Sequence, residues 1–244
     1  MLRLLVLACA LSPAAQREPV VLRAARPAGV PVRVAEVCLA DPRVRVRVQV
    51  ASGFPGRAEL FERMVARSRP LLAVNGAYFS KTTLAPIGDL VVDGRLVRSG
   101  LMGTALAIAP DGRALIRRVR WGHSEDWSAY STVLACGPAL VLNGQVDVHP
   151  EAEGFRDPHI MGSTRRMGVG ITPDDRLLIV TTLAPVSFAE WARVMLGLGC
   201  RDAMNLDAGA SLALYYRGRV LIRPGRALTN LLTVHVSAGS AAAP

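Results

Sequence analysis

The sequence has few cysteines, and none of them form a pair at metal-binding spacing. The four cysteines are Cys9, Cys38, Cys136 and Cys200, and no C-x-x-C motif is present. A structural zinc site is therefore disfavoured, since such sites commonly use paired cysteines. One disulfide could form among Cys38, Cys136 and Cys200 in an oxidising compartment, but the sequence does not select the pair. Three small buried thiols are the favoured interpretation.

Long apolar runs and clustered cations are also missing. Beyond the N-terminus no segment reaches the roughly 18 apolar residues that span a bilayer, so no transmembrane segment is predicted. The 29 Lys and Arg residues exceed the 19 Asp and Glu residues, but the cations are scattered arginines, with Lys81 as the only lysine. Neither an RNA-binding motif nor a block of five cations is present, so nucleic acid is not a predicted partner. The net charge of +10 favours an anionic or phosphate-bearing substrate.

The N-terminus has the pattern of a secretory signal. One arginine is followed by an apolar run over residues 4–11 and by small residues, with cleavage expected after Ala10 or Ala15. A lipid-modified Cys9 and an unprocessed start are the alternatives. We therefore expect export to the periplasm or the extracellular space. The predicted division is a signal peptide over 1–15, an arm or linker over 16–29, one domain over 30–236 and a tail over 237–244.

The remaining pattern predicts an α+β fold. With 244 residues, the chain is long enough for one large domain with a sizeable core. The valines of 44–50 alternate with polar residues from Arg43 to Gln49, which indicates a strand with one buried and one wet, cationic face. Turn pairs such as Asp93-Gly94 predict hairpins. Helical spacing over 57–67 and a capping box at Ser187 predict two helices. We expect a single domain of largely antiparallel sheets with a few packed helices.

The order of elements repeats along the chain. A strand, a helix, a strand and an asparagine-containing loop end at Asn75 and again at 205–207, so a pseudo-duplicated domain is an interpretation of this order alone. Residues 149–164 lack periodicity and are rich in charge, glycine and proline. A loop of that length inside a compact domain is often functional. His159 in this loop is the histidine of interest, although the four histidines show no metal spacing.

The segment 204–211 has the clearest chemical potential. A buried strand delivers Asn205 and Asp207 on one side, and Gly209 lets the backbone turn sharply towards a ligand. The N–H groups of such a turn are suited to form an anion-binding nest. The alternative is a plain β-turn in which Asp207 bonds its own backbone.

Two further segments carry groups suited to a phosphate or a sugar. Arg165 and Arg166 lead directly into a strand, where a guanidinium is able to grip a phosphate with two hydrogen bonds. Surface cations at a strand start are the simpler interpretation of this segment alone. Asn75 and Gly76 end a buried strand, where the amide either orients a substrate oxygen or only caps the turn.

Taken together, these segments resemble the phosphodiester glycosidase family. The resemblance covers about residues 30–236, and several motifs in the right order are more specific than any one of them. The matching stretches are Asn75 to Phe79, Gly137 to Val141, Arg166 to Ile171, Phe188 to Cys200, Asn205 to Ser211 and Thr229 to Leu232. The chain departs from the usual family pattern at Ala77, Ala208 and Ala210, where glycines are common, and at Leu212, where a second serine is common.

The resemblance implies a hydrolase that cleaves the glycosidic bond of a sugar-1-phosphate diester. A phosphate leaves easily because its second pKa is about 6, so a carboxylate near the anomeric carbon and a cation on the phosphate suffice. The implied catalytic residues are Asp207 and Arg166, and the implied substrate-binding residues are Asn75, Gly76, Asn205, Gly209 and Ser211. No cofactor and no metal ligands are predicted, while a requirement for a divalent metal stays open. The alternative is a non-catalytic cell-envelope module that binds an anionic glycopolymer.

Overall fold

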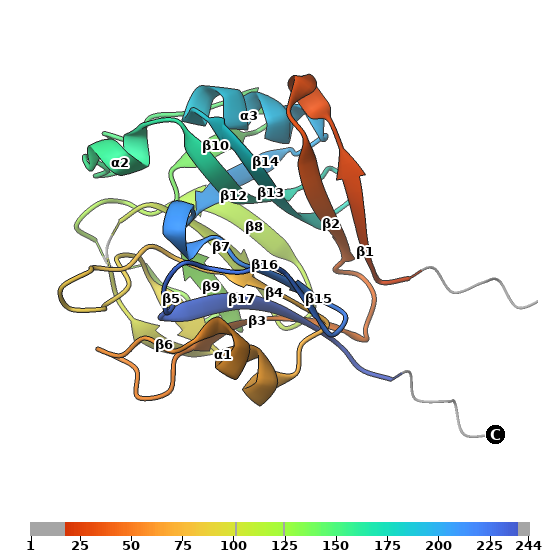
Figure 1. Ribbon diagram of the computed structural model, residues 1–244, viewed down its shortest axis with the longest axis vertical. Helices are drawn as coiled ribbons and strands as arrows, with labels where there is room; N and C mark the ends of the chain where they lie inside the picture. Colours follow the sequence, from red (N-terminus) through yellow and green to blue (C-terminus); the bar gives the residue numbers. More distant parts are fainter. Residues whose placement is uncertain (1–17, 101, 124, 239–244) are drawn as a thin grey trace, which may run out of the picture.

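The computed structural model describes residues 18–100, 102–123 and 125–238 (Figure 1). The predicted signal peptide lies outside these residues, as does most of the predicted tail. Within the described part, no helix has the length and apolar character needed to cross a membrane. The prediction of largely antiparallel sheets with few helices in one domain is confirmed, since every named strand pair is antiparallel.

The largest sheet has seven strands and carries one helix on its outer face (Figure 1). Helix α3 (Phe188–Gly197) packs on it through Trp191 and Met195, which are fully buried. In spatial order the strands are β1 (Val20–Ala25), β2 (Val32–Cys38), β13 (Arg176–Val186), β12 (Thr164–Ile171), β14 (Asp202–Leu206), β10 (Ala139–Leu142) and β11 (Gln145–Val146).

The predicted arm over residues 16–29 is wrong for its central part. Val20 to Ala25 form β1, which pairs with β2 in full register, and residues 27–29 form a short 3-10 helix. Composition suggested a linker because alanine, arginine and proline dominate the segment. As an edge strand, β1 needs only one row of hydrogen bonds and one buried valine, Val20, to be held.

Two five-stranded sheets complete the domain. Helix α1 (Phe61–Ser68) covers the second sheet. The strands of the second sheet are β16 (Arg219–Ile222), β15 (Leu214–Tyr216), β4 (Leu72–Asn75), β17 (Asn230–Val236) and β3 (Val44–Val50). The strands of the third sheet are β6 (Arg95–Arg98), β5 (Leu90–Val92), β9 (Thr132–Ala135), β7 (Thr104–Ile108) and β8 (Ala114–Arg118).

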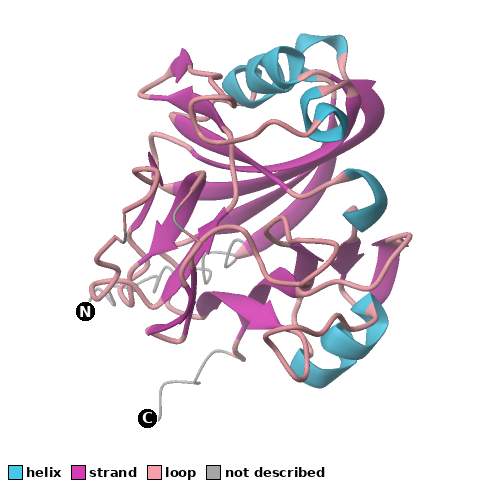
Figure 2. Cartoon of the chain, turned by 90° about the vertical axis from the view of Figure 1, so that its left-hand side faces the viewer, coloured by secondary structure: helices cyan, strands magenta, loops and turns pink. Residues whose placement is uncertain are grey.

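The main core lies between the three sheets, and the helices lie at the outside (Figure 2). The valines at 44, 46 and 48 are buried while Arg45 and Arg47 are exposed, so the predicted alternation of β3 is confirmed. Gln49 differs from the expectation of a wet face, since α1 covers that end of the strand. Its amide donates to the Met64 carbonyl at 2.8 Å and accepts from the Ser68 hydroxyl at 2.5 Å.

The helix boundaries follow local signals only in part. The predicted capping box at Ser187 is confirmed, because its hydroxyl accepts from the Glu190 N–H and the Glu190 carboxylate accepts from the Ser187 N–H. Helix α1 begins four residues later than predicted, at Phe61. The loop over 149–164 is not irregular throughout, since it contains the short helix α2 (Pro158–Met161), whose cap is Asp157. A single helical turn has too few residues to show a periodicity.

Within the described residues, Cys38, Cys136 and Cys200 are free thiols, so no disulfide forms among them. Cys136 and Cys200 are buried and Cys38 is partly exposed. Burial raises the pKa of Cys136 well above its ordinary value and that of Cys200 to about 12. Both thiols therefore behave as small apolar core residues.

Candidate active site

Two loops from different sheets meet and are bonded to each other. One follows β4 at Asn75 and the other follows β14 at Asp207. The Asp207 N–H donates to the Gly76 carbonyl at 3.1 Å. In return, the Asn75 side-chain amide donates to the Asp207 carbonyl, and its oxygen accepts from the Ala213 N–H at 2.9 Å. The two repeated strand–helix–strand units thus end at one place in the molecule.

Gly76 and Asn230 complete the base under this junction. A Cβ at position 76 would lie 2.1 Å from the side-chain oxygen of Asn230, so any larger residue would push that side chain aside. That oxygen accepts from the Ala77 N–H at 2.6 Å. Asn75 and Gly76 are therefore parts of the supporting framework, and neither lines the cavity above it.

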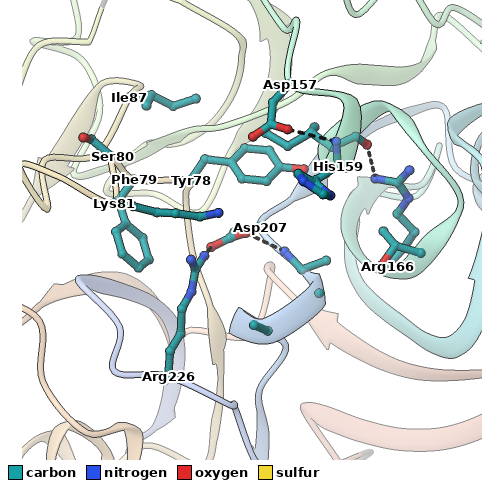
Figure 3. Close-up of a pocket in the computed structure, with 15 residues that line it drawn as sticks. Tyr78, Phe79, Ser80, Lys81, Ile87, Asp157, His159, Arg166, Asp207 and Arg226 are labelled. Atoms are coloured by element: carbon teal, nitrogen blue, oxygen red, sulfur yellow. Dashed lines mark hydrogen bonds and ion pairs between the residues drawn. The ribbon is translucent and has the colours of Figure 1, made fainter.

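A cavity of about 450 Å³ opens over the junction (Figure 3). Its walls come from the segment after β4, from the α2 region, from the turn after β14 and from the loop before β17. The lining residues are Tyr78, Phe79, Ser80, Lys81, Ile87, Asp157, His159, Ile160, Thr164, Arg166, Asp207, Ala208, Gly209, Ala210 and Arg226.

Asp207 is the buried carboxylate of the cavity. Only 4% of the residue is exposed, and its carboxylate accepts from the Ala208 N–H at 2.8 Å and from Arg226 at 3.1 Å. Burial raises the pKa of Asp207 from 3.8 to about 6, against the opposing effects of the Ser211 hydroxyl and the Arg226 charge. A carboxyl group that titrates near neutral pH in a cavity is typical of an active site.

Arg226 is the cation that holds Asp207. Its Nε donates to the Ser211 hydroxyl at 2.7 Å, and its guanidinium lies 4.5 Å from the centre of the Phe79 ring. Figure 3 shows it reaching the carboxylate from the side of the cavity opposite to α2. Arg226 was not predicted from the sequence, because a scattered arginine three residues before the Thr229 to Leu232 stretch carries no local signal.

Arg166 lines the same cavity as Asp207 but is engaged differently. It is 1% exposed, and its guanidinium lies 3.9 Å from the centre of the Phe188 ring. Burial lowers the pKa of Arg166. Three of its five N–H donors are used on main-chain carbonyl oxygens, at 3.1 Å from Ile160, 2.5 Å from Gly162 and 3.2 Å from Val186.

The bonds of Arg166 therefore hold the α2 region against the large sheet. The expected two-bond grip on a phosphate is left with only the two remaining N–H donors. Neither expectation from the sequence describes this arginine fully, since it is neither a surface cation nor a free anion ligand.

Asn205 supports the cavity from below through Tyr78. It is fully buried, and its amide donates to the Tyr78 hydroxyl at 2.8 Å and to the Leu206 carbonyl at 2.6 Å. Its side-chain oxygen has no hydrogen-bond partner among the described residues. Burial raises the pKa of Tyr78 well above its ordinary value, so the phenol stays protonated. Because the phenolic oxygen accepts from Asn205, its own hydrogen is available to a ligand in the cavity.

In the turn after Asp207, the backbone conformation favours glycine at position 209 but not at position 208. Gly209 has a φ of 56°, in the left-handed region, whereas Ala208 has an extended φ of −151°. Ala208 has no positive φ that would call for glycine, while the left-handed conformation at 209 favours glycine. Ser211 is fully buried behind the cavity and contacts Arg226 rather than the open space.

The predicted residues thus divide into two groups. Asp207, Arg166 and Gly209 line the cavity, while Asn75, Gly76, Asn205 and Ser211 hold the lining in place. His159 of α2, the histidine of interest from the sequence, also lines the cavity. The cavity residues that were not predicted from the sequence include Tyr78, Phe79, Lys81, Asp157 and Arg226. Among the described residues, no group of three or more His, Cys, Asp or Glu side chains is arranged to hold a metal ion.

Comparisons with known proteins point to one family. The family model for phosphodiester glycosidase matches residues 68–235. The catalytic domain of zebrafish N-acetylglucosamine-1-phosphodiester alpha-N-acetylglucosaminidase, auto-inhibited by its pro-peptide, is similar in structure. Its TM-score is 0.71 at 20% sequence identity, over 92% of this chain and 86% of that one. A search of curated proteins finds no significant match.

Two bacterial structures are also similar. A hypothetical protein from Synechocystis has a TM-score of 0.75 at 14% identity, over 88% of this chain. The chain spans 61% of the length of that protein. A protein from Burkholderia pseudomallei K96243, described as exported, has a TM-score of 0.60 at 16% identity, over 84% of this chain and 74% of that one. At these identities the structural likeness shows the fold.

Proposed function

This chain belongs to the phosphodiester glycosidase family and is a glycosidase-type hydrolase, and we propose that it cleaves the glycosidic bond of a sugar-1-phosphate diester. The observation that carries this substrate class is the buried carboxylate of Asp207, in a cavity that is also lined by Lys81, Arg166 and Arg226. A carboxylate serves the electron-poor anomeric carbon, and a cationic cavity suits an anionic substrate. Since the family is one of enzymes, the alternative of a non-catalytic binding module is not retained.

In the proposed reaction, the bond between the anomeric carbon and the phosphate oxygen breaks. The electron pair leaves with the phosphate, which departs as a phosphomonoester, and water supplies the new hydroxyl group on the sugar. Asp207 faces the anomeric carbon, either as the nucleophile or as the charge that stabilises an oxocarbenium-like transition state. A strong general acid is not required, because a phosphate is a good leaving group with a second pKa of about 6.

Arg226 and Ser211 prepare Asp207 for this role. Their contacts with the carboxylate lower its pKa against the effect of burial, so that it is ionised above about pH 6. Arg226 also fixes the direction of the carboxylate through its bond at 3.1 Å. Tyr78 lies on the side of Asp207 away from Arg226 (Figure 3), and it offers a protonated hydroxyl to a substrate oxygen. The carboxylate is therefore available in one orientation and in its charged form near neutral pH.

The test is turnover of a panel of sugar-1-phosphate diesters by the purified chain and by its Asp207→Asn variant. We expect hydrolysis of at least one diester, with release of the free sugar, and its loss in the variant. Absence of hydrolysis across the panel by the folded wild-type chain would contradict the proposed substrate class.

We further propose that the chain acts in the periplasm or outside the cell. The support is the signal-like N-terminal pattern of residues 1–15. Sequencing of the protein from the secreted or membrane fraction should reveal a first residue between Leu11 and Glu18. An intact Met1 in a cytoplasmic fraction would contradict export.

A further inference from the structure

Lys81 is the only lysine of the chain, although lysine and arginine together make up 29 of its residues. This single lysine lines the cavity that contains Asp207. Arginine is otherwise the cation of this sequence, both on its surface and in its ion pairs. Lysine differs from arginine in being a compact, strongly hydrated point charge on a flexible stem. The position of the one lysine therefore points to a role that needs a mobile ammonium group.

The turn that carries Lys81 directs its side chain over the cavity. The Ser80 hydroxyl accepts from the N–H groups of Thr82 and Thr83, at 3.3 and 3.1 Å, and the Leu84 N–H donates to the Ser80 carbonyl at 2.8 Å. These bonds close a tight turn around position 81. Figure 3 shows the ammonium end of Lys81 pointing towards the middle of the cavity. Within the described part of the chain, this ammonium takes part in no hydrogen bond or ion pair.

The other two cations of the cavity are already engaged. Arg226 is paired with Asp207, bonded to Ser211 and placed over Phe79. Arg166 is buried among main-chain carbonyl oxygens. Of the three, Lys81 is thus the cation whose charge is neither neutralised by a carboxylate nor used to hold the protein together.

Resting on the proposed function, we propose that Lys81 binds the phosphate of the substrate and gives the enzyme its preference for a phosphate leaving group. A phosphodiester carries one negative charge, and the departing phosphomonoester carries up to two. An ammonium beside it therefore attracts the leaving group more strongly in the transition state than in the bound substrate. A 4-nitrophenyl aglycone is uncharged in the substrate and departs with a single, delocalised negative charge, so it gains less from this contact, and Lys81 determines specificity as well as rate.

The flexible stem of lysine suits this role better than the guanidinium of arginine. As the bond breaks, the phosphate oxygens move away from the sugar, and the three donors of an ammonium can rotate to follow them. The fork of an arginine is planar and fixed, so it fits one arrangement of oxygens best. Lys81→Arg should therefore retain binding of a phosphate and lose part of the turnover.

The kinetic test compares two leaving groups on one sugar. The substrates are a sugar-1-phosphate diester that the wild-type chain hydrolyses and the 4-nitrophenyl glycoside of the same sugar. For Lys81→Gln we expect kcat/KM on the diester to fall by about 10- to 100-fold and that on the 4-nitrophenyl glycoside to fall by a several-fold smaller factor. Arg165→Gln is the matched control, because it removes one exposed charge near the cavity without lining it. Equal losses on both substrates, or no loss on the diester, would overturn the proposal.

A binding test separates this inference from the proposed function. Reductive methylation with carbon-13 formaldehyde labels one side-chain amine, that of Lys81, besides the N-terminal amine, and keeps its charge. The Lys81 signal is assigned by its loss in Lys81→Arg. It should shift in the NMR spectrum on addition of α-glucose-1-phosphate or inorganic phosphate and stay unchanged with methyl α-glucoside.

The two tests fail in different ways. If the chain hydrolyses the diester but the Lys81 signal does not shift with α-glucose-1-phosphate or inorganic phosphate, the role of Lys81 is overturned and the proposed function stands. A signal that responds to phosphate, in a folded chain that hydrolyses no diester, would support phosphate binding by Lys81 and contradict the proposed function.

Discussion

The side-chain amide of Asn75 donates a hydrogen bond to the main-chain carbonyl of Asp207, 132 positions later in the chain. The N–H of the same aspartate donates to the carbonyl of Gly76. Both backbone groups of Asp207 are therefore held by one short loop from another sheet. Asn75 thus has a positioning role, because it fixes the peptide that carries the carboxylate without reaching the cavity itself.

We expect Asn75→Ala to destabilise the protein and to impair turnover. The substitution leaves the Asp207 carbonyl and the Ala213 N–H buried without this partner, and each such group costs about 1–3 kcal/mol. The free energy of unfolding should fall by about 2–6 kcal/mol, measured by urea denaturation. The control is Asn143→Gly at the β10–β11 hairpin, where φ is 52° and glycine is tolerated. An unchanged unfolding midpoint in Asn75→Ala would contradict the role of this bond.

Elements defined by neighbouring residues were predictable from the sequence. The hairpin at Asp93-Gly94 and the capping box at Ser187 depend on residues within a few positions, so their signals are local. The β3 alternation was readable up to Gln49, where α1 covers the strand. The edge strand β1 was missed because its pairing partner, rather than its own composition, makes it a strand.

The residues of the candidate site could be predicted only where they belong to a local sequence motif. Asp207 and Gly209 lie in a recognisable strand-and-turn pattern, and both line the cavity. Arg226 acquires its role from a carboxylate 19 positions away, and nothing near it in the sequence distinguishes it from other arginines. The burial of Arg166 depends on how the α2 region folds back over β12, which periodicity does not reveal.

Arg166→Lys should lower both stability and turnover, whereas Arg165→Lys should change neither measurably. A lysine loses the planar contact with the Phe188 ring and cannot reproduce the geometry of bonds to three carbonyl oxygens. We expect the melting temperature to fall by several degrees and the α2 region to exchange its amide hydrogens faster, since it loses its anchor. Arg165 is exposed and does not line the cavity, which makes it the matched control. Equal, mild effects at both positions would contradict the role of Arg166 in holding the α2 region.

Asp207→Asn should lose turnover by about a hundredfold or more without losing stability at neutral pH. The folded-state pKa of about 6 lies above the ordinary 3.8, so the ionised form is disfavoured in the folded protein. This costs up to about 3 kcal/mol, and the cost develops as the pH rises from about 4 to about 6. The variant avoids that cost, so its melting temperature at about pH 8 should equal or exceed that of the wild type.

The difference between the two proteins should shrink towards pH 4, where the wild-type carboxyl is protonated in both folded and unfolded states. Melting curves and turnover are measured on the same preparations across this pH range. Full turnover with unchanged melting would remove Asp207 from the mechanism. A large loss of melting temperature at high pH would instead indicate a structural role for the charge.

The pH dependence of turnover should follow the ionisation of Asp207. If the carboxylate is the active form, kcat/KM rises with pH and levels off above an apparent pKa of about 6. Burial sets this value above 3.8, and the Ser211 hydroxyl and the Arg226 charge oppose it. Removing either opposing group disfavours the carboxylate further, so Arg226→Gln and Ser211→Ala should both shift the rising limb to higher pH. The measurement is kcat/KM between about pH 4.5 and about pH 9, with Arg165→Gln as the control for a general loss of charge. A wild-type kcat/KM that falls as the pH rises through about 6 would show that the protonated carboxyl is the active form. An equal shift of the pH profile in Arg165→Gln would show that Arg226 does not lower the pKa of Asp207 specifically.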